Sequence, residues 1–149
     1  MLIRSDNCLE IGEMTKETTF ENSEALEKSP SVMIVIEDSQ YYGRIHQRYL
    51  KELGVETVIL HEGGNFEEKI AKIKKNKNII GVITDGLHGN WESVYQAALK
   101  NDIKNTWLIT GNEDLIDKSK YFPCLKAISK VDLHKNPNKY KTVAKIVEK

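Results

Sequence analysis

Acidic side chains directly follow two apolar runs of this sequence. Asp85 comes after the run of residues 79–84, and Glu37 with Asp38 comes after the run of residues 32–36. A carboxylate at the end of a buried segment is unfavourable unless a helix cap, a cation or a partner charge compensates it. These residues therefore predict either helix caps or a site that holds a divalent cation.

Two other polar residues stand at equivalent places further along the chain. Thr110 ends the apolar run of residues 106–110, and Lys130 follows the run of residues 125–129. A hydroxyl and an ammonium group beside carboxylates are suited to holding phosphoryl oxygens by hydrogen bond and by charge. Each residue alone could equally be a strand end, a turn residue or a solvated lysine, so only their combination indicates a site.

The elements that must position these residues alternate regularly. Continuous apolar runs, typical of strands covered on both faces, occupy residues 32–36, 56–60, 79–84, 106–110 and 125–129. Amphipathic stretches predict helices after Ser39, from Asn65, from Trp91, near residue 113 and from about Pro137. Strands alternating with helices predict an α/β fold with a doubly wound five-stranded parallel sheet, flavodoxin-like order 2-1-3-4-5 and helices on both faces.

In such a sheet the carboxyl ends of the strands share one edge, where ligands bind next to the point at which the strand order reverses. The five polar residues are expected to meet there, whereas His61, after the second strand, lies apart. Two carboxylates about 4 Å apart repel by roughly 4 kcal/mol at an effective dielectric near 20, so Glu37, Asp38 and Asp85 together require a cation. An oxygen-only site that also faces a phosphoryl group suits Mg²⁺.

In this order along the chain the polar residues resemble those of the receiver domain of two-component response regulators. The matching features are an acidic pair after the first strand, Asp85 after the third, Thr110 with a small residue after the fourth, and Lys130 after the fifth. The resemblance covers about residues 31–149. It implies that Asp85 is the phosphoacceptor and that Thr110 and Lys130 complete the catalytic set by holding the phosphoryl oxygens.

The resemblance also implies the ligands and partners. Mg²⁺ would be held by Asp38, Asp85 and the backbone carbonyl of Leu87, with Glu37 acting through water. The chain would be a phosphoprotein of a two-component phosphorelay in signal transduction, accepting phosphate from a histidine kinase or histidine phosphotransfer protein and passing the signal to a downstream protein target. It would be no enzyme beyond its own phosphorylation and dephosphorylation, and a monomer or weak homodimer.

Three features depart from the family pattern. Gly89 stands where a proline is usual, and the loop after Asp85 is short. Val131 follows Lys130 in place of a proline, so a trans peptide bond is expected there. Ala127 occupies the position of the switch aromatic. These departures leave open an alternative, a degenerate receiver that acts as a protein-binding module without phosphorylation.

Composition limits the remaining possibilities. Equal numbers of basic and acidic residues, 22 each, favour neither direct nucleic-acid binding nor a membrane surface. Residues 1–30 are acidic and without periodicity, which predicts a flexible extension before a receiver-like domain at residues 31–149. Cys8 and Cys124 are too few for a disulfide framework and imply no oxidation chemistry, so a cytoplasmic location is the default. The start lacks a secretion signal, and no apolar run is long enough for a membrane span.

Other interpretations have fewer supporting residues in the sequence. His88, three residues after Asp85, could be a metal ligand, but no second histidine or cysteine lies nearby in the sequence. A phosphohydrolase would need a second carboxylate two residues after Asp85, where Leu87 stands instead. A cobalamin-binding domain would need a histidine at that same place. Trp91 and Trp107 are expected in the core, and His46, His61 and His134 at the surface or on helices.

Overall fold

The computed structural model describes residues 31–61 and 64–145, with five strands in one sheet. The strands are β1 (Ser31–Ile36), β2 (Glu56–Leu60), β3 (Asn78–Thr84), β4 (Thr106–Thr110) and β5 (Leu125–Ser129). All neighbouring pairs are parallel, and the order is β2-β1-β3-β4-β5. The predicted doubly wound, flavodoxin-like α/β fold is therefore confirmed, and each predicted strand agrees with the observed one to within a residue.

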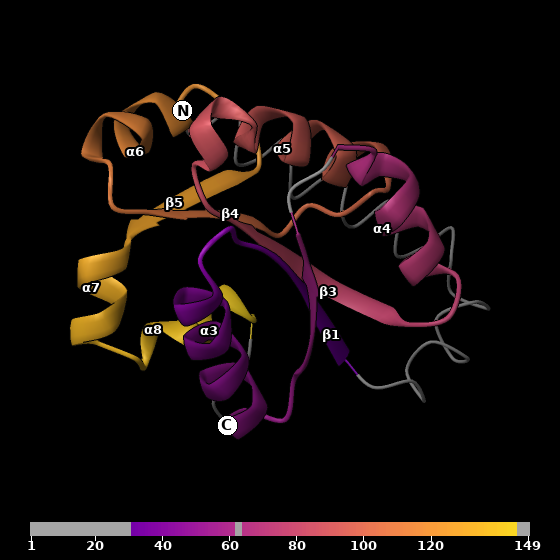
Figure 1. Cartoon of the computed structure of the whole chain (residues 1–149), viewed down its shortest axis with the longest axis horizontal. Coiled ribbons are helices and arrows are strands. Elements are labelled where there is room, and N and C mark those ends of the chain that lie inside the picture. The colour runs from indigo at the N-terminus through magenta and orange to yellow at the C-terminus, as the bar shows by residue number, and fades with distance from the viewer. Residues whose placement is uncertain (1–30, 62–63, 146–149) are drawn as a thin grey trace.

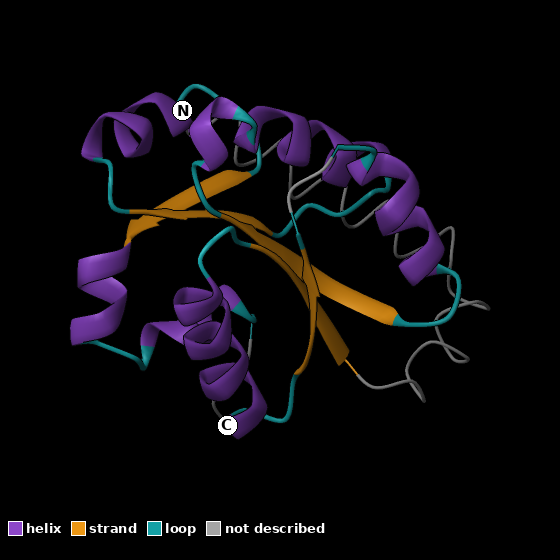
Figure 2. Cartoon of the chain, in the orientation of Figure 1, coloured by secondary structure: helices purple, strands orange, loops and turns teal. Residues whose placement is uncertain are grey.

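Helices cover both faces of the sheet (Figures 1 and 2). On one face lie α4 (Phe66–Lys74), α5 (Trp91–Lys100) and α6 (Glu113–Ser119); on the other lie α3 (Gln40–Glu52), α7 (Lys130–Lys135) and α8 (Lys139–Val143). A short 3-10 turn, η1 (Leu87–Gly89), follows β3. Among the described residues, no helix combines the length and apolar character needed to cross a bilayer.

The core explains why the apolar runs become strands. Val32 to Ile36 of β1 are fully buried, because this central strand is covered by helices on both faces. One face packs on α3, α7 and α8 through Leu50, Leu133 and Tyr140. Trp91 and Trp107 are both buried, as expected.

The ends of the first helix agree with the sequence signals that mark them. Ser39 precedes α3, and its hydroxyl accepts a hydrogen bond from the backbone N–H of Tyr42 at 3.3 Å. Gly54 ends that helical region with φ +80°, a conformation that glycine adopts without strain. The α4, α5 and α6 helices lie where the amphipathic pattern places them.

The segment after β5 differs from the prediction. A single helix was expected from about Pro137, but α7 already begins at Lys130 and α8 follows it. The Ser129 hydroxyl caps α7 by accepting the N–H of Asp132 at 3.0 Å. The spacing of Ser129 and Asp132 is that of a capping box, a sequence signal that could have located this helix.

One other expectation was wrong, and two were confirmed. His46 lies on a helix, α3, as expected; it is 1% exposed, and its Nδ1 lies 2.7 Å from the Tyr140 hydroxyl. Cys124, for which no oxidation chemistry was expected, is disulfide-bonded. None of the described peptide bonds is cis, so the bond between Lys130 and Val131 is trans, as expected. The predicted extension at residues 1–30 lies outside the described residues.

Candidate functional site: an acidic cluster bridged by a lysine

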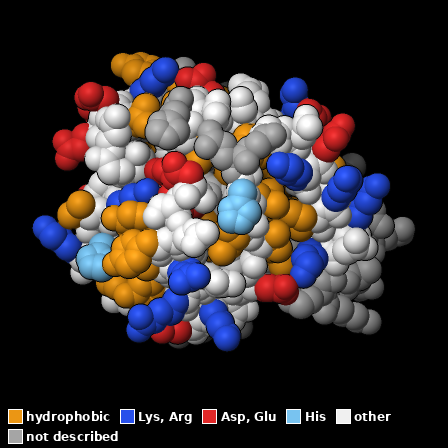
Figure 3. Space-filling model, in the orientation of Figure 1, with side chains coloured by type: hydrophobic (Ala, Val, Ile, Leu, Met, Phe, Trp, Pro, Cys, Tyr) orange, Lys and Arg blue, Asp and Glu red, His pale blue; other side chains and the backbone are white. Residues whose placement is uncertain are grey.

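Three carboxylates meet at the carboxyl edge of the sheet. Ligand oxygens of Glu37 and Asp38, after β1, and of Asp85, after β3, lie within 4.8 Å of one another. The backbone N–H of Asp85 donates to the Ile36 carbonyl at 3.1 Å, which holds the ends of the two strands together. In Figure 3, acidic side chains reach the surface over the loop between β1 and α3. The predicted convergence of the acidic residues is thus observed.

Lys130 lies between two of these carboxylates. Its Nζ is 3.2 Å from Glu37 Oε2 and 3.2 Å from Asp85 Oδ1, and its side chain is only 13% exposed. Burial disfavours the ammonium ion, but the charges and hydrogen bonds of Glu37 and Asp85 outweigh burial and raise the pKa of Lys130. The lysine predicted from the end of β5 therefore reaches the acidic residues at the ends of β1 and β3.

The pKa values of Glu37 and Asp38 are shifted in opposite directions. Glu37 is 3% exposed, and burial raises the pKa of its carboxyl group to about 7; the nearby Asp85 charge acts in the same direction. The Ser39 N–H, which donates to Glu37 Oε1 at 3.0 Å, opposes this rise. Asp38 is exposed, and a side-chain hydrogen bond with Glu37 lowers its pKa. Glu37 is thus the member of this pair whose carboxyl group is still partly protonated near neutral pH.

Thr110 lies close to the loop that follows Asp85. Its side chain ends β4 and is buried, and its Oγ1 accepts the backbone N–H of Asn112 at 3.1 Å. A Cβ atom added to Gly86 would lie 3.6 Å from Thr110 Oγ1 and 2.9 Å from a methyl group of Leu115. Because only glycine fits this space comfortably, the threonine hydroxyl can stand next to the residue that follows Asp85.

Leu87 contributes backbone geometry. Its φ of 49° lies in the left-handed region, and its side chain is buried in the core with Ile36 and Phe66. Its carbonyl accepts the N–H of Asn90 at 3.0 Å and retains a second lone pair. The predicted role of this carbonyl as a metal ligand stays a prediction. The side chain of His88 lies outside the described part of the structure, so its suggested role as a ligand cannot be placed.

Two contributors to the cluster were not predicted. Ser39 was expected only as a helix cap, yet its N–H binds Glu37. The ring of Tyr42 lies under Lys130, with Nζ 4.1 Å from the ring centroid. The Ser39 contact is local, between residues two apart in the chain. The Tyr42 contact has no sequence signal, because it depends on how the first turn of α3 meets the start of α7.

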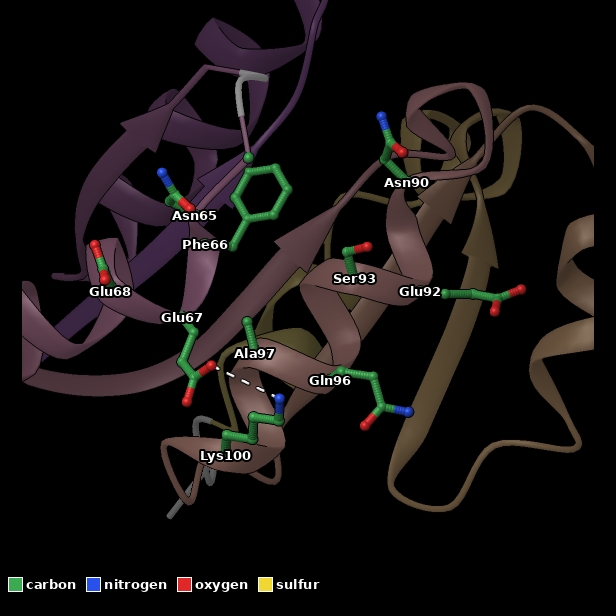
Figure 4. Close-up of a pocket in the computed structure, with 11 residues that line it drawn as sticks. Asn65, Phe66, Glu67, Glu68, Asn90, Glu92, Ser93, Gln96, Ala97 and Lys100 are labelled. Atoms are coloured by element: carbon green, nitrogen blue, oxygen red, sulfur yellow. Dashed lines mark ion pairs between the residues drawn. The ribbon is translucent and has the colours of Figure 1, made fainter.

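A separate groove of about 640 Å³ lies between the N-terminal turn of α4 and the length of α5 and contains none of the predicted site residues. Figure 4 shows Glu67 and Lys100 facing each other across its floor, and their charged atoms are 3.7 Å apart. Glu92 at its rim pairs with Lys118 at 3.1 Å. With these charges paired, the groove offers no concentrated charge for a ligand.

The residues present fit a divalent cation. A hard cation prefers several oxygen ligands, and the three carboxylates supply them within 4.8 Å of one another. Burial is the main cause of the raised pKa of Glu37, but the nearby Asp85 charge raises that pKa by more than the Lys130 charge lowers it. The cluster therefore has both the ligand atoms and the electrostatic demand for a cation.

Comparison with known proteins adds no family. No protein-family model matches the chain, and no curated protein matches it significantly. The expected resemblance to receiver domains therefore stays a prediction.

Mg²⁺ is expected to stabilise the protein more at high pH than at low pH. Glu37 has a folded pKa of about 7 and an ordinary value of 4.5, so its protonated form favours the native state. This contribution is present below about pH 4.5 and is lost as the pH rises through about 7. A cation that needs the ionised carboxylate should bind about 30-fold more tightly at pH 8 than at pH 5.5.

Thermal unfolding with and without Mg²⁺ at these two pH values measures the effect. Glu37→Gln should remove most of the pH dependence, since the amide does not titrate. The matched variant Glu68→Gln, at an exposed glutamate of α4, should behave as wild type. An unchanged pH dependence in Glu37→Gln would contradict the assignment.

Proposed function

We propose that this chain is a phosphoacceptor signalling protein of a two-component phosphorelay, which accepts phosphate on Asp85 and passes the signal by protein contact. One observation carries the proposal: the clustered carboxylates of Glu37, Asp38 and Asp85, with the Lys130 ammonium 3.2 Å from both Glu37 and Asp85. This is the arrangement expected where an anionic phosphoryl group must approach a carboxylate nucleophile.

Asp85 would act as the nucleophile. One of its carboxylate oxygens attacks the phosphorus atom of the donor, a new P–O bond forms, and the donor's bond to phosphorus breaks. The electron pair of that broken bond leaves with the donor, and the product is an aspartyl phosphate. Asp85 is half-buried, so one oxygen can face solvent while the other remains beside Lys130.

Lys130 and Thr110 would hold the phosphoryl oxygens. Lys130 is protonated at neutral pH and already lies beside the nucleophile. Its ammonium group can therefore pair with the negatively charged oxygens of the phosphoryl group. The Thr110 hydroxyl can donate one hydrogen bond to the phosphoryl group while its oxygen accepts the N–H of Asn112. Both groups stabilise charge at the position where it develops.

Mg²⁺ is the cofactor that these ligands suit, and when bound it would neutralise the carboxylates and the charge of the transferring group. Asp38 and Asp85 would bind it directly with the Leu87 carbonyl, and Glu37 would act through water. Asp38 is suited to this role because its pKa is lowered and it is exposed.

The donor would be a histidine kinase or a histidine phosphotransfer protein, and the output would be a contact with a downstream protein. Ala127, on β5 where the family has an aromatic switch residue, packs against the cluster that contains Trp91, Tyr95 and Leu108. With no large side chain at that position, movement of Thr110 has no aromatic ring on β5 to displace. The output would then depend on other groups that contact the site.

Incubation with a small acyl-phosphate donor and Mg²⁺ tests the proposal. We expect one phosphoryl group per chain, mapped to Asp85 by peptide mass spectrometry, and no modification when the metal is chelated. Phosphate on another residue, or none at all under conditions in which Mg²⁺ binds, would count against it.

One observation favours the alternative of a phosphorylation-independent binding module. Lys130 already bridges Glu37 and Asp85, so part of the acidic charge is compensated within the chain. In that case millimolar Mg²⁺ would leave the unfolding midpoint unchanged at pH 8, and no phosphate would be incorporated.

A further inference from the structure

The position of the Lys130 ammonium is defined by three groups from three parts of the chain. Two are the carboxylates of Glu37 and Asp85, and the third is the ring of Tyr42, whose centroid lies 4.1 Å from Nζ. This distance is well inside the limit of about 6 Å for an effective cation–π contact. The ring therefore occupies a side of the ammonium group that carboxylates do not.

Tyr42 is itself held by the site. Its backbone N–H donates to the Ser39 hydroxyl at 3.3 Å, and the Ser39 N–H donates to Glu37 Oε1 at 3.0 Å. Lys130 contacts both ends of this chain of contacts, the Glu37 carboxylate and the Tyr42 ring. The end of β1, the first turn of α3 and the start of α7 are thus joined in one closed set of contacts.

The ring, rather than the hydroxyl, makes this contact. Among the described residues, the Tyr42 hydroxyl has no hydrogen-bond partner, while the ring contacts Lys130 and the edge of the Tyr41 ring. In Figure 3, hydrophobic side chains gather between α3 and α7, the helices that carry Tyr42 and Lys130. A phenylalanine should therefore replace Tyr42 with little loss, whereas an aliphatic side chain should not.

We propose that Tyr42 is a positioning residue: its ring holds the Lys130 ammonium beside Asp85 and thereby connects the first turn of α3 to the occupant of the site. A lysine side chain has several rotatable bonds, so its ammonium group can adopt many positions; contact with the ring restricts them. When a phosphoryl group on Asp85 draws the ammonium away from the ring, the contact with the ring weakens. Because β5 carries Ala127 in place of an aromatic, the response then appears at α3. This last step rests on the proposed function; the positioning itself does not.

Proton NMR of the full chain gives the first test. The ring current of Tyr42 should place the ε-methylene protons of Lys130 upfield of those of the other lysines, with the signal assigned by its loss in Lys130→Arg. Tyr42→Phe should keep this shift and Tyr42→Leu should lose it. Tyr41→Leu, which removes the adjacent ring that is 65% exposed, serves as the matched control and should keep it.

The second test is the rate of phosphorylation by a small acyl-phosphate donor with Mg²⁺. A cation–π contact of ordinary strength corresponds to a loss of about fivefold in Tyr42→Leu, with rates close to wild type in Tyr42→Phe and Tyr41→Leu. Circular dichroism melting of each variant confirms that the comparison is made on folded protein.

The two tests separate the two proposals. An upfield Lys130 signal that persists in Tyr42→Leu, or is lost equally in Tyr42→Phe, would overturn the role of Tyr42. If wild-type protein shows the expected signals but takes no phosphate, the proposed function fails and the positioning of Lys130 by Tyr42 stands.

Discussion

Asp85→Asn is expected to abolish incorporation of phosphate from a small acyl-phosphate donor. The amide of asparagine has nearly the same shape as the carboxylate but lacks the anionic oxygen that attacks phosphorus. Lys130 keeps its contact with Glu37 in this variant, so the site should remain assembled. Intact-protein mass spectrometry should show the phosphorylated species in wild type and none in Asp85→Asn.

A matched control separates this effect from general loss of charge. Asp117 lies on α6, is exposed, and its side chain pairs with the nearby ammonium of Lys120, away from the predicted site residues. Asp117→Asn should therefore be phosphorylated as wild type is. Equal incorporation in wild type and Asp85→Asn would show that the phosphate is elsewhere, and the proposed mechanism would be wrong.

Asn105→Ala is expected to cause the largest loss of stability among these variants, about 4 kcal/mol in the free energy of unfolding. Asn105 is 4% exposed, and its amide nitrogen donates to the carbonyls of Ile80 at 3.1 Å and Val143 at 2.7 Å. Its amide oxygen accepts Trp107 Nε1 at 3.1 Å and Lys126 Nζ at 3.2 Å. Alanine would leave several of these buried groups without a partner.

The packing around Asn105 explains why the loss should not be recovered by relaxation. A Cβ atom on Gly81 would lie 2.6 Å from Asn105 Nδ2 and 2.8 Å from its carbonyl oxygen, so β3 approaches this side chain as closely as a glycine allows. The register of β1 and β3 shifts between Val32 and Met33, where Ile80 has no partner on β1. The Ile80 carbonyl at this irregularity is one of the groups that Asn105 binds.

Urea unfolding measures the effect. Asn76→Ala is the matched control, because Asn76 is exposed and has no side-chain hydrogen bond among the described residues. Its free energy of unfolding should change by no more than about 0.5 kcal/mol. A similar change in both variants would mean that the hydrogen bonds of Asn105 contribute little.

Much of the architecture could be predicted because it depends on local patterns. A strand buried on both faces needs a continuous apolar run, and five such runs appear in the sequence at the positions of the five strands. The helices between them have apolar stripes, and Ser39 marks the start of α3. The region after β5 has a weaker pattern, since α7 and α8 are too short for an apolar stripe and only the capping pattern of Ser129 and Asp132 marks the start of α7.

The membership of the site was also visible in the sequence, because parallel strands present their carboxyl ends at one edge. The sequence therefore groups Glu37, Asp38, Asp85 and Lys130 at one edge, and the structure brings them together there. The sequence does not predict their individual properties. The pKa of Glu37 depends on how deeply the end of β1 is buried. That burial results from several elements, distant in the sequence, that pack around the strand end.

The sequence thus specifies the five-stranded fold and the residues that gather at its edge. Both follow from the order of apolar runs, helix caps and polar strand ends, and each of these signals depends on residues that are near neighbours in the chain. Three-dimensional packing alone sets the partners that lie far apart in the chain: Tyr42 against Lys130, His46 against Tyr140, and Asn105 against Val143. Such contacts depend on side-chain direction and on the distance between elements to within an ångström or so. No periodicity or spacing in one sequence contains that information.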